Sequence, residues 1–106
     1  VCFTSDKMGD GDPELGEILI KGFVYALTQL ETPPAVILFY NGGARLTAKD
    51  SPCIEDLRTL QEQGTEILTC GTCVNFYDLG EPVVGTVTNM YTIAEKLTNA
   101  SKVIRP

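Results

Sequence analysis

The chain of 106 residues contains no histidine. It therefore cannot build a Ser-His or Cys-His nucleophile pair, a histidine-ligated zinc site or the usual general base at neutral pH. No apolar run approaches the ~18 residues of a membrane-spanning helix, and no signal-peptide pattern is present. We expect no membrane partner, and any chemistry must come from cysteine, carboxylate, tyrosine, lysine or backbone groups.

Positive charge is also scarce. Eight Lys and Arg stand against 14 Asp and Glu, which gives a net charge of −6 at pH 7. The basic residues are scattered singly, whereas proteins that bind nucleic acid gather them into patches. The composition therefore predicts no nucleic-acid partner.

The length suits one domain with a real core, so we expect a single domain over residues 1–106. Its first residues, Val1 to Thr4, already have a strand-like composition. We therefore interpret the chain as a fragment of a longer protein, and the resemblance described below implies that it is the C-terminal one.

Strand-like and helix-like segments alternate along the chain. The run at 35–40 is continuously apolar, which is typical of a central parallel strand covered on both faces. The alternation predicts βαβ units and an α/β fold whose parallel sheet is covered by helices on both faces. Five strands are predicted, at residues 1–5, 35–40, 65–69, 83–87 and 102–105.

The first helix has the clearest signals. Asp12 and Pro13 supply a capping carboxylate and a proline at the first helical position, and Thr88 or Asn89 is predicted to cap the last helix. Residues that share one stripe at three-and-four spacing are expected to face the core. In the first helix they are Leu15, Ile18, Leu19, Gly22, Phe23, Ala26, Leu27 and Leu30.

Two cysteines three residues apart, Cys70 and Cys73, lie in the turn between the third strand and the next helix. In parallel sheets ligands bind beyond the carboxyl ends of the strands, so this turn lies where function is expected. Free N–H groups and the dipole at a helix start stabilise a thiolate. We therefore predict that Cys73 has the lower pKa, that Cys70 faces the same cleft as its partner, and that both are reduced in a cytoplasmic setting.

Other readings of the cysteines are weaker. Cys2 and Cys53 are interpreted as small buried hydrophobes. A structural zinc site would need four ligands, and with one C-x-x-C and no histidine we expect no metal and no cofactor. A thioredoxin-type protein would place its motif after an early strand, opposite a cis-proline, and a cysteine phosphatase would need an arginine soon after the nucleophile. Two cysteines that only pack remain an alternative.

Four blocks of sequence resemble a known family. They are similar to the C-terminal domain of YedF-type proteins, which are sulfurtransferase-like proteins of selenium metabolism in the wider DsrE/DsrF-like family. The resemblance covers essentially the whole chain and implies a three-layer α/β/α fold, a five-stranded parallel sheet and a homo-oligomer. The blocks are residues 5–12 with Leu15 and Gly16, residues 39–43, residues 70–73 and residues 88–91.

The resemblance also implies a site. In sulfur-relay relatives a cysteine after the third strand carries a persulfide, and the turn at Cys70 and Cys73 is the matching place. Such relatives commonly carry a basic residue soon after that cysteine, whereas this loop continues from Asn75 to Asp78. A small sulfur carrier of the TusA type is the implied partner. The supporting loop residues are Gly71, Thr72, Asn41, Gly42, Gly43 and Asn89.

The leading hypothesis is a sulfur or selenium carrier, or a sulfurtransferase-like domain, that uses Cys70 or Cys73 as persulfide acceptor. The other thiol would resolve or stabilise the persulfide. The alternative is a non-catalytic oligomerisation or partner-binding module in which the two cysteines only close a turn. An apolar patch near the same edge would favour a homo-oligomer. Its expected members are Phe76, Tyr77, Leu79, Met90 and Tyr91.

Overall fold

The computed structural model describes residues 1–106 and contains one parallel sheet. Its four strands lie side by side in chain order, and every neighbouring pair is parallel. The internal position of the apolar run at 35–40, parallel to the strands on either side, confirms the prediction for that run. The strands are β1 (Cys2–Phe3), β2 (Val36–Phe39), β3 (Glu66–Cys70) and β4 (Thr86–Thr88).

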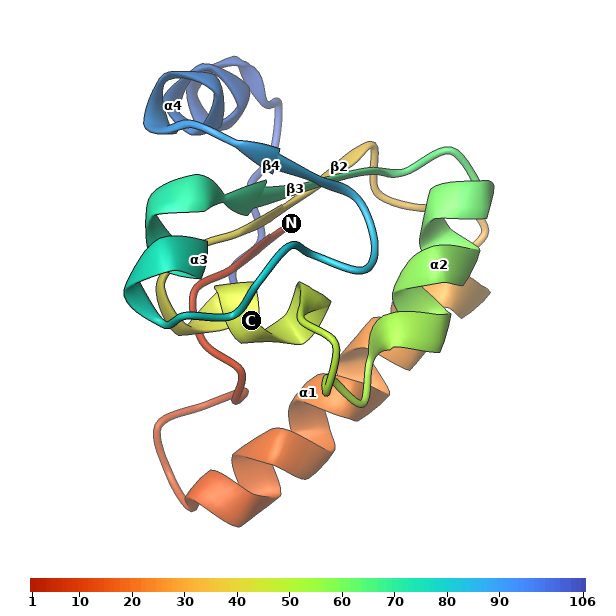
Figure 1. Cartoon of the computed structure of the whole chain (residues 1–106). Coiled ribbons are helices and arrows are strands. Elements are labelled where there is room, and N and C mark those ends of the chain that lie inside the picture. The colour runs from red at the N-terminus through yellow and green to blue at the C-terminus, as the bar shows by residue number, and fades with distance from the viewer.

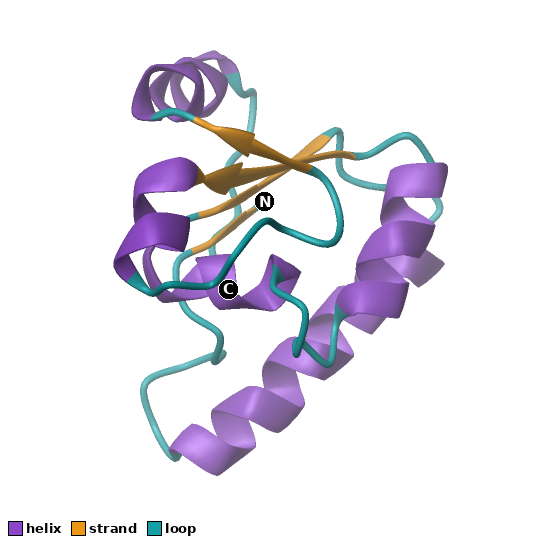
Figure 2. Cartoon of the chain, in the orientation of Figure 1, coloured by secondary structure: helices purple, strands orange, loops and turns teal.

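Helices connect the strands (Figures 1 and 2). The Asp12 carboxylate accepts the Leu15 N–H at 2.9 Å at the start of the first helix, and the Asn89 side chain accepts the Thr92 N–H at 2.9 Å at the start of the last. Both predicted caps are confirmed. The helices are α1 (Pro13–Gln29), the 3₁₀ helix η1 (Asn41–Thr47), α2 (Ile54–Glu62), α3 (Gly71–Phe76) and α4 (Met90–Asn99).

The order of the strands determines which face each helix covers. The chain crosses the sheet steadily from β1 to β4, so right-handed crossovers place α1 and α2 on one face. After β4 the chain runs back toward β1, and α4 therefore lies on the opposite face (Figure 1). The result is a sheet with helices on both sides.

Alternate residues of the central strands enter two separate cores. Ile37 and Phe39 join the larger core beneath α1 and α2. Leu38 joins the smaller core with Cys70 and with Ile93 of α4. All five side chains are at most 3% exposed, and burial of each large apolar side chain contributes about 1.5–3 kcal/mol. Burial on both faces explains why the run at 35–40 is apolar without alternation.

The predicted five-stranded sheet is wrong, because the sheet has four strands. Residues 102–105 lie beside β1, and the Ile104 carbonyl accepts the Cys2 N–H at 2.9 Å, but they form no strand. Val103 and Ile104 are 47% and 42% exposed, so neither side chain is held in a core. A single edge hydrogen bond without a buried face does not extend the ladder.

The predicted inner face of α1 is wrong in large part, although Leu27 is buried and Phe23 packs against the larger core as predicted. The residues that α1 buries are Gly16, Ile20, Val24, Leu27 and Thr28. Most of the predicted stripe faces outward instead, with exposures from 44% to 64% at Leu15, Ile18, Leu19 and Leu30. Both stripes have helical spacing and both are apolar, so periodicity could not choose between them.

Contact with the loop after β1 explains which stripe α1 buries. The Met8 N–H donates to the Gly16 carbonyl at 3.0 Å, and a Cβ on Gly16 would lie 2.9 Å from that of Lys7. This close approach turns Gly16 inward. On the same helix, Gly22 faces open space.

Gly43 and Gly22 give a matched test of this packing. A Cβ on Gly43 would overlap the Phe3 carbonyl, because η1 lies directly against the end of β1. We expect Gly43→Ala to lower the free energy of unfolding by about 2 kcal/mol or more. Gly22→Ala should raise it by about 0.5–1 kcal/mol through helix propensity. Urea denaturation measures both, and equal effects would contradict this packing.

Candidate functional site

The segments that follow β2 and β3 meet at the carboxyl edge of the sheet. Phe39 lies opposite Thr69 in the parallel register, so η1 and α3 leave the sheet next to each other. Asn41 is the first residue of η1, and Cys73 lies in the first turn of α3. The Asn41 N–H donates to the Cys73 sulfur at 3.1 Å. A backbone donor therefore fixes one sulfur at the edge where the sequence predicts function.

The two predicted site cysteines have different surroundings. Cys70 ends β3 and is only 1% exposed, with its side chain in the smaller core beside Cys2 and Leu38. Cys73 is half-buried and packs against the edge of the same core. The prediction that Cys70 faces the cleft is wrong, because strand alternation sends it to the same face as Leu68.

All four cysteines are free thiols. Cys2 is 2% exposed and Cys53 has no exposed surface, which confirms both as buried side chains. Of the four, only Cys73 has more than marginal contact with solvent. Any reagent that reaches a thiol of the folded chain therefore meets Cys73 first.

Burial raises the pKa of the Cys73 thiol above its ordinary value, and the neighbouring Cys70 thiol raises it further. The Asn41 N–H acts in the opposite direction and lowers this pKa in part. The expectation that the start of α3 lowers the pKa of the Cys73 thiol below its ordinary value is therefore wrong. Desolvation and the neighbouring Cys70 thiol together outweigh the Asn41 N–H, which is the contribution that lowers this pKa.

Two residues that the sequence did not assign to the site complete it. The Tyr77 hydroxyl donates to the Asn41 side-chain oxygen at 2.7 Å. The guanidinium carbon of Arg45 lies 4.3 Å from the centre of the Tyr77 ring, a cation–π distance. Arg45 thus brings a positive charge from η1 to the residue that follows α3. No local motif joins these residues, because they lie on separate elements.

The other predicted loop residues have structural roles. A Cβ on Gly71 would lie 2.9 Å from the Val87 side chain, so glycine lets α3 begin against β4. Gly42 and Gly43 bring η1 close to the end of β1. Thr72 is exposed, and the Asn89 side chain is used in capping α4. Of the supporting residues, only Asn41 makes a hydrogen bond to a thiol.

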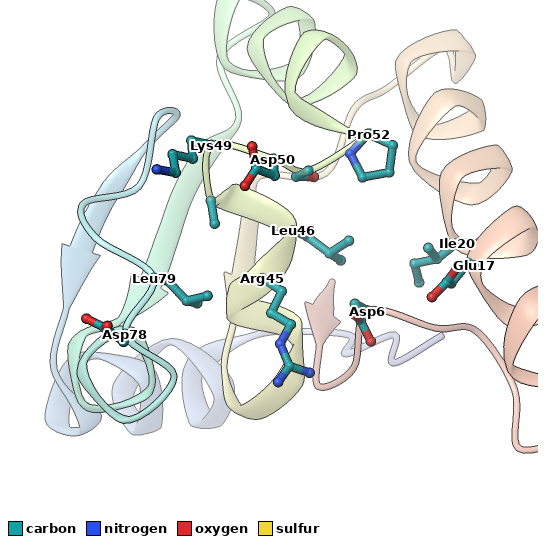
Figure 3. Close-up of a pocket in the computed structure, with 12 residues that line it drawn as sticks. Asp6, Glu17, Ile20, Arg45, Leu46, Lys49, Asp50, Pro52, Asp78 and Leu79 are labelled. Atoms are coloured by element: carbon teal, nitrogen blue, oxygen red, sulfur yellow. The ribbon is translucent and has the colours of Figure 1, made fainter.

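A cleft of about 420 Å³ adjoins this group. Figure 3 shows Arg45 and Leu46 extending from η1, Glu17 and Ile20 facing them from α1, and Asp78 near the loop after α3. Neither Cys70 nor Cys73 lines this cleft. Arg45 lines it and also lies over the Tyr77 ring. A larger cleft of about 750 Å³ lies at the other end of the strands, near residues 32–36 and the end of α4.

Apolar side chains are exposed around the same carboxyl edge. Phe76 on α3 is 81% exposed, and Met90 and Tyr91 at the start of α4 are 59% and 77% exposed. Tyr77 and Leu79, from the same predicted patch, are half-buried. The patch therefore exists with fewer members than expected.

Two other features bear on the classes of function. No group of three or more cysteine or carboxylate side chains is placed to hold a metal ion. None of the helices is both long and apolar enough to cross a membrane.

Comparison with known proteins supports the fold. Neither a protein-family model nor a curated protein sequence matches the chain. Among solved structures, it is similar to the protein of unknown function MTH1491 from Methanobacterium thermoautotrophicum, with a TM-score of 0.68 and 20% sequence identity. The match covers 99% of this chain and 95% of that one. At this identity the likeness establishes the α/β fold alone.

The influence of Cys70 on Cys73 can be measured. The two contributions of Cys70 both favour the protonated form of Cys73, so Cys70→Ala should lower the Cys73 pKa. Alkylation of Cys73 at pH 7 should become about two- to tenfold faster, because only the thiolate reacts. Peptide mass spectrometry after timed iodoacetamide exposure measures the rate. Cys2→Ala, in the same core, is the control, and an equal rate increase in both variants would contradict the assignment.

Proposed function

We propose that Cys73 accepts sulfane sulfur, or the equivalent selenium, as a carrier or sulfurtransferase-like domain. The observation that carries the proposal is the Asn41 N–H bound to the Cys73 sulfur at 3.1 Å, with the buried Cys70 thiol alongside. This arrangement provides one accessible nucleophilic sulfur with a fixed donor beside it. The four sequence blocks that resemble the DsrE/DsrF-like family support the same chemistry.

The loading step balances without an oxidant. The Cys73 thiolate attacks the outer sulfur of a donor persulfide, R–S–SH. A new bond forms between that sulfur and Cys73, the S–S bond of the donor breaks, and the donor leaves as the thiolate R–S⁻. The Asn41 N–H stabilises negative charge on Cys73 before attack. The raised pKa makes the Cys73 thiolate less abundant at neutral pH, but each thiolate that forms is more nucleophilic toward the donor persulfide.

The difference in burial between Cys70 and Cys73 determines which thiol can accept sulfur from an external donor. Cys70 is 1% exposed, so an external donor cannot reach its sulfur without a change in the strand end. We therefore assign acceptance to Cys73 and a stabilising role to Cys70. Attack of Cys70 on the loaded Cys73 would release HS⁻ and leave a disulfide, which needs a reductant before the next cycle.

The proposal also names a setting and a partner. Reduced thiols require a reducing compartment, which the cytoplasm supplies. A small TusA-like sulfur carrier is the proposed donor, and a homo-oligomer is the proposed assembly. The exposed apolar side chains of Phe76, Met90 and Tyr91 provide the contact surface for either.

Intact mass measurement tests the acceptor. After incubation with a low-molecular-weight persulfide, the chain should gain the mass of one sulfur atom, and a thiol reductant should remove it. Cys73→Ser should abolish the gain, while Cys2→Ser and Cys53→Ser should retain it because both side chains are buried. Full loading of Cys73→Ser together with loss in Cys70→Ser would reverse the roles. Equal loading of the double variant would refute the carrier function.

A second candidate is a non-catalytic oligomerisation or partner-binding module. The observation that favours it is the exposed apolar surface at Phe76, Val87, Met90 and Tyr91. Light scattering of the parent chain and of Phe76→Ser with Tyr91→Ser, combined with the sulfur-loading assay, discriminates the two. The module predicts a multimer that the double substitution dissociates and a parent chain that takes up no sulfur. Sulfur loading of Cys73 in the parent chain would instead favour the carrier.

A further inference from the structure

Three contacts connect Arg45 to Cys73 in series. Arg45 lies over the Tyr77 ring at 4.3 Å, the Tyr77 hydroxyl donates to the Asn41 side chain at 2.7 Å, and the Asn41 N–H donates to the Cys73 sulfur at 3.1 Å. Arg45 and Asn41 both belong to η1. Cys73 lies on α3, and Tyr77 is the residue that ends it. The series therefore connects η1 with both the first turn and the C-terminal end of α3.

Asn41 needs to be held if its N–H is to reach a sulfur. Its φ is +50°, in the left-handed region that non-glycine residues rarely occupy, although asparagine tolerates it better than most. The direction of the N–H depends on this backbone conformation. Asn41 is exposed, and the Tyr77 hydroxyl is the one hydrogen-bond partner of its side chain. Loss of that contact would free the residue to relax.

Tyr77 is connected to Cys73 through the backbone of α3. Its N–H donates to the Cys73 carbonyl at 3.1 Å, in the last turn of α3. The contacts therefore close a ring, from Cys73 through the helix backbone to Tyr77, across to Asn41 and back to the Cys73 sulfur. In such a ring, a shift at one contact changes the geometry of the others.

Arg45 has no competing ion pair. None of the three salt bridges of the chain includes it, and the nearby Asp6 is paired with Lys7 at 3.0 Å. Its interaction is with the ring of Tyr77. A cation above an aromatic ring withdraws electron density from it, which makes the phenol hydroxyl a better donor toward Asn41.

We propose that Tyr77 and Arg45 are positioning residues that hold the Asn41 N–H on the Cys73 sulfur and so determine how readily that thiol ionises. The biological purpose rests on the proposed carrier function. The ionisation itself does not, because it can be measured without any sulfur donor.

The test is the pH dependence of Cys73 alkylation in the full chain, followed by peptide mass spectrometry. Tyr77→Phe removes only the hydroxyl, and we expect about three- to tenfold slower alkylation at pH 7, with the profile displaced to higher pH. Tyr25→Phe is the matched control, because Tyr25 lies on α1, is 55% exposed, and its hydroxyl makes no hydrogen bond. Thermal unfolding of both variants checks that they fold.

Arg45→Gln should displace the profile in the same direction by a smaller amount, and Arg45→Lys should restore part of it. Lys49→Gln removes a positive charge just after η1 without touching Tyr77, so it should leave the profile close to that of the parent. If Arg45→Gln and Lys49→Gln had equal effects, Arg45 would act only through its positive charge and not through its contact with Tyr77. That result would overturn the proposal for Arg45.

A double-mutant cycle separates positioning from general damage. Asn41→Gly keeps the N–H and permits the left-handed backbone but removes the acceptor of the Tyr77 hydroxyl. Because Tyr77 acts through Asn41, Tyr77→Phe should have no further effect in the Asn41→Gly chain. Additive effects, or an unchanged profile in Tyr77→Phe, would overturn the proposal.

Sulfur loading of the same variants keeps the two proposals distinguishable. A parent chain that takes up no sulfur, while Tyr77→Phe still displaces the alkylation profile, would refute the carrier function and support the positioning role. A parent chain that loads fully, together with an unchanged alkylation profile in Tyr77→Phe, would support the carrier function and refute the positioning role.

Discussion

Because β2 and β3 are parallel neighbours with Phe39 opposite Thr69, the segments that follow them leave the sheet side by side. This register places the backbone N–H of Asn41 3.1 Å from the sulfur of Cys73, although 32 residues separate them in the chain. A one-residue slip would turn every strand side chain to the other face and separate the two groups. Gly43, which lets η1 lie against β1, helps to maintain the same geometry.

The ionisation of Cys73 depends on a balance between opposing effects. Desolvation and the adjacent Cys70 favour the protonated thiol, whereas the Asn41 N–H favours the thiolate. Since the first two are larger, the pKa is raised, and the N–H limits the increase. Loss of any contact that holds Asn41 would therefore raise the pKa of the Cys73 thiol further.

Much of the fold could be predicted from local patterns. Alternating strand and helix segments gave the parallel sheet, and Asp12 and Asn89 were recognisable as caps. The inner face of α1 could not be chosen, because two apolar stripes of equal spacing compete until the loop at Lys7 contacts one of them. The segment near Ile104 has strand-like composition but no buried face.

The candidate site was only half predictable. Its position at the sheet edge and the involvement of Cys73 and Asn41 followed from the C-x-x-C turn and from the sequence blocks. The burial of Cys70 depends on which face of β3 it occupies, and the contributions of Tyr77 and Arg45 depend on contacts between elements. The most direct test is the pH titration of the Asn41 backbone amide by ¹H–¹⁵N NMR. We predict that its resonance moves with the same midpoint as Cys73 ionisation and stops moving in Cys73→Ser. An Asn41 amide that stays unchanged while Cys73 ionises would contradict the account.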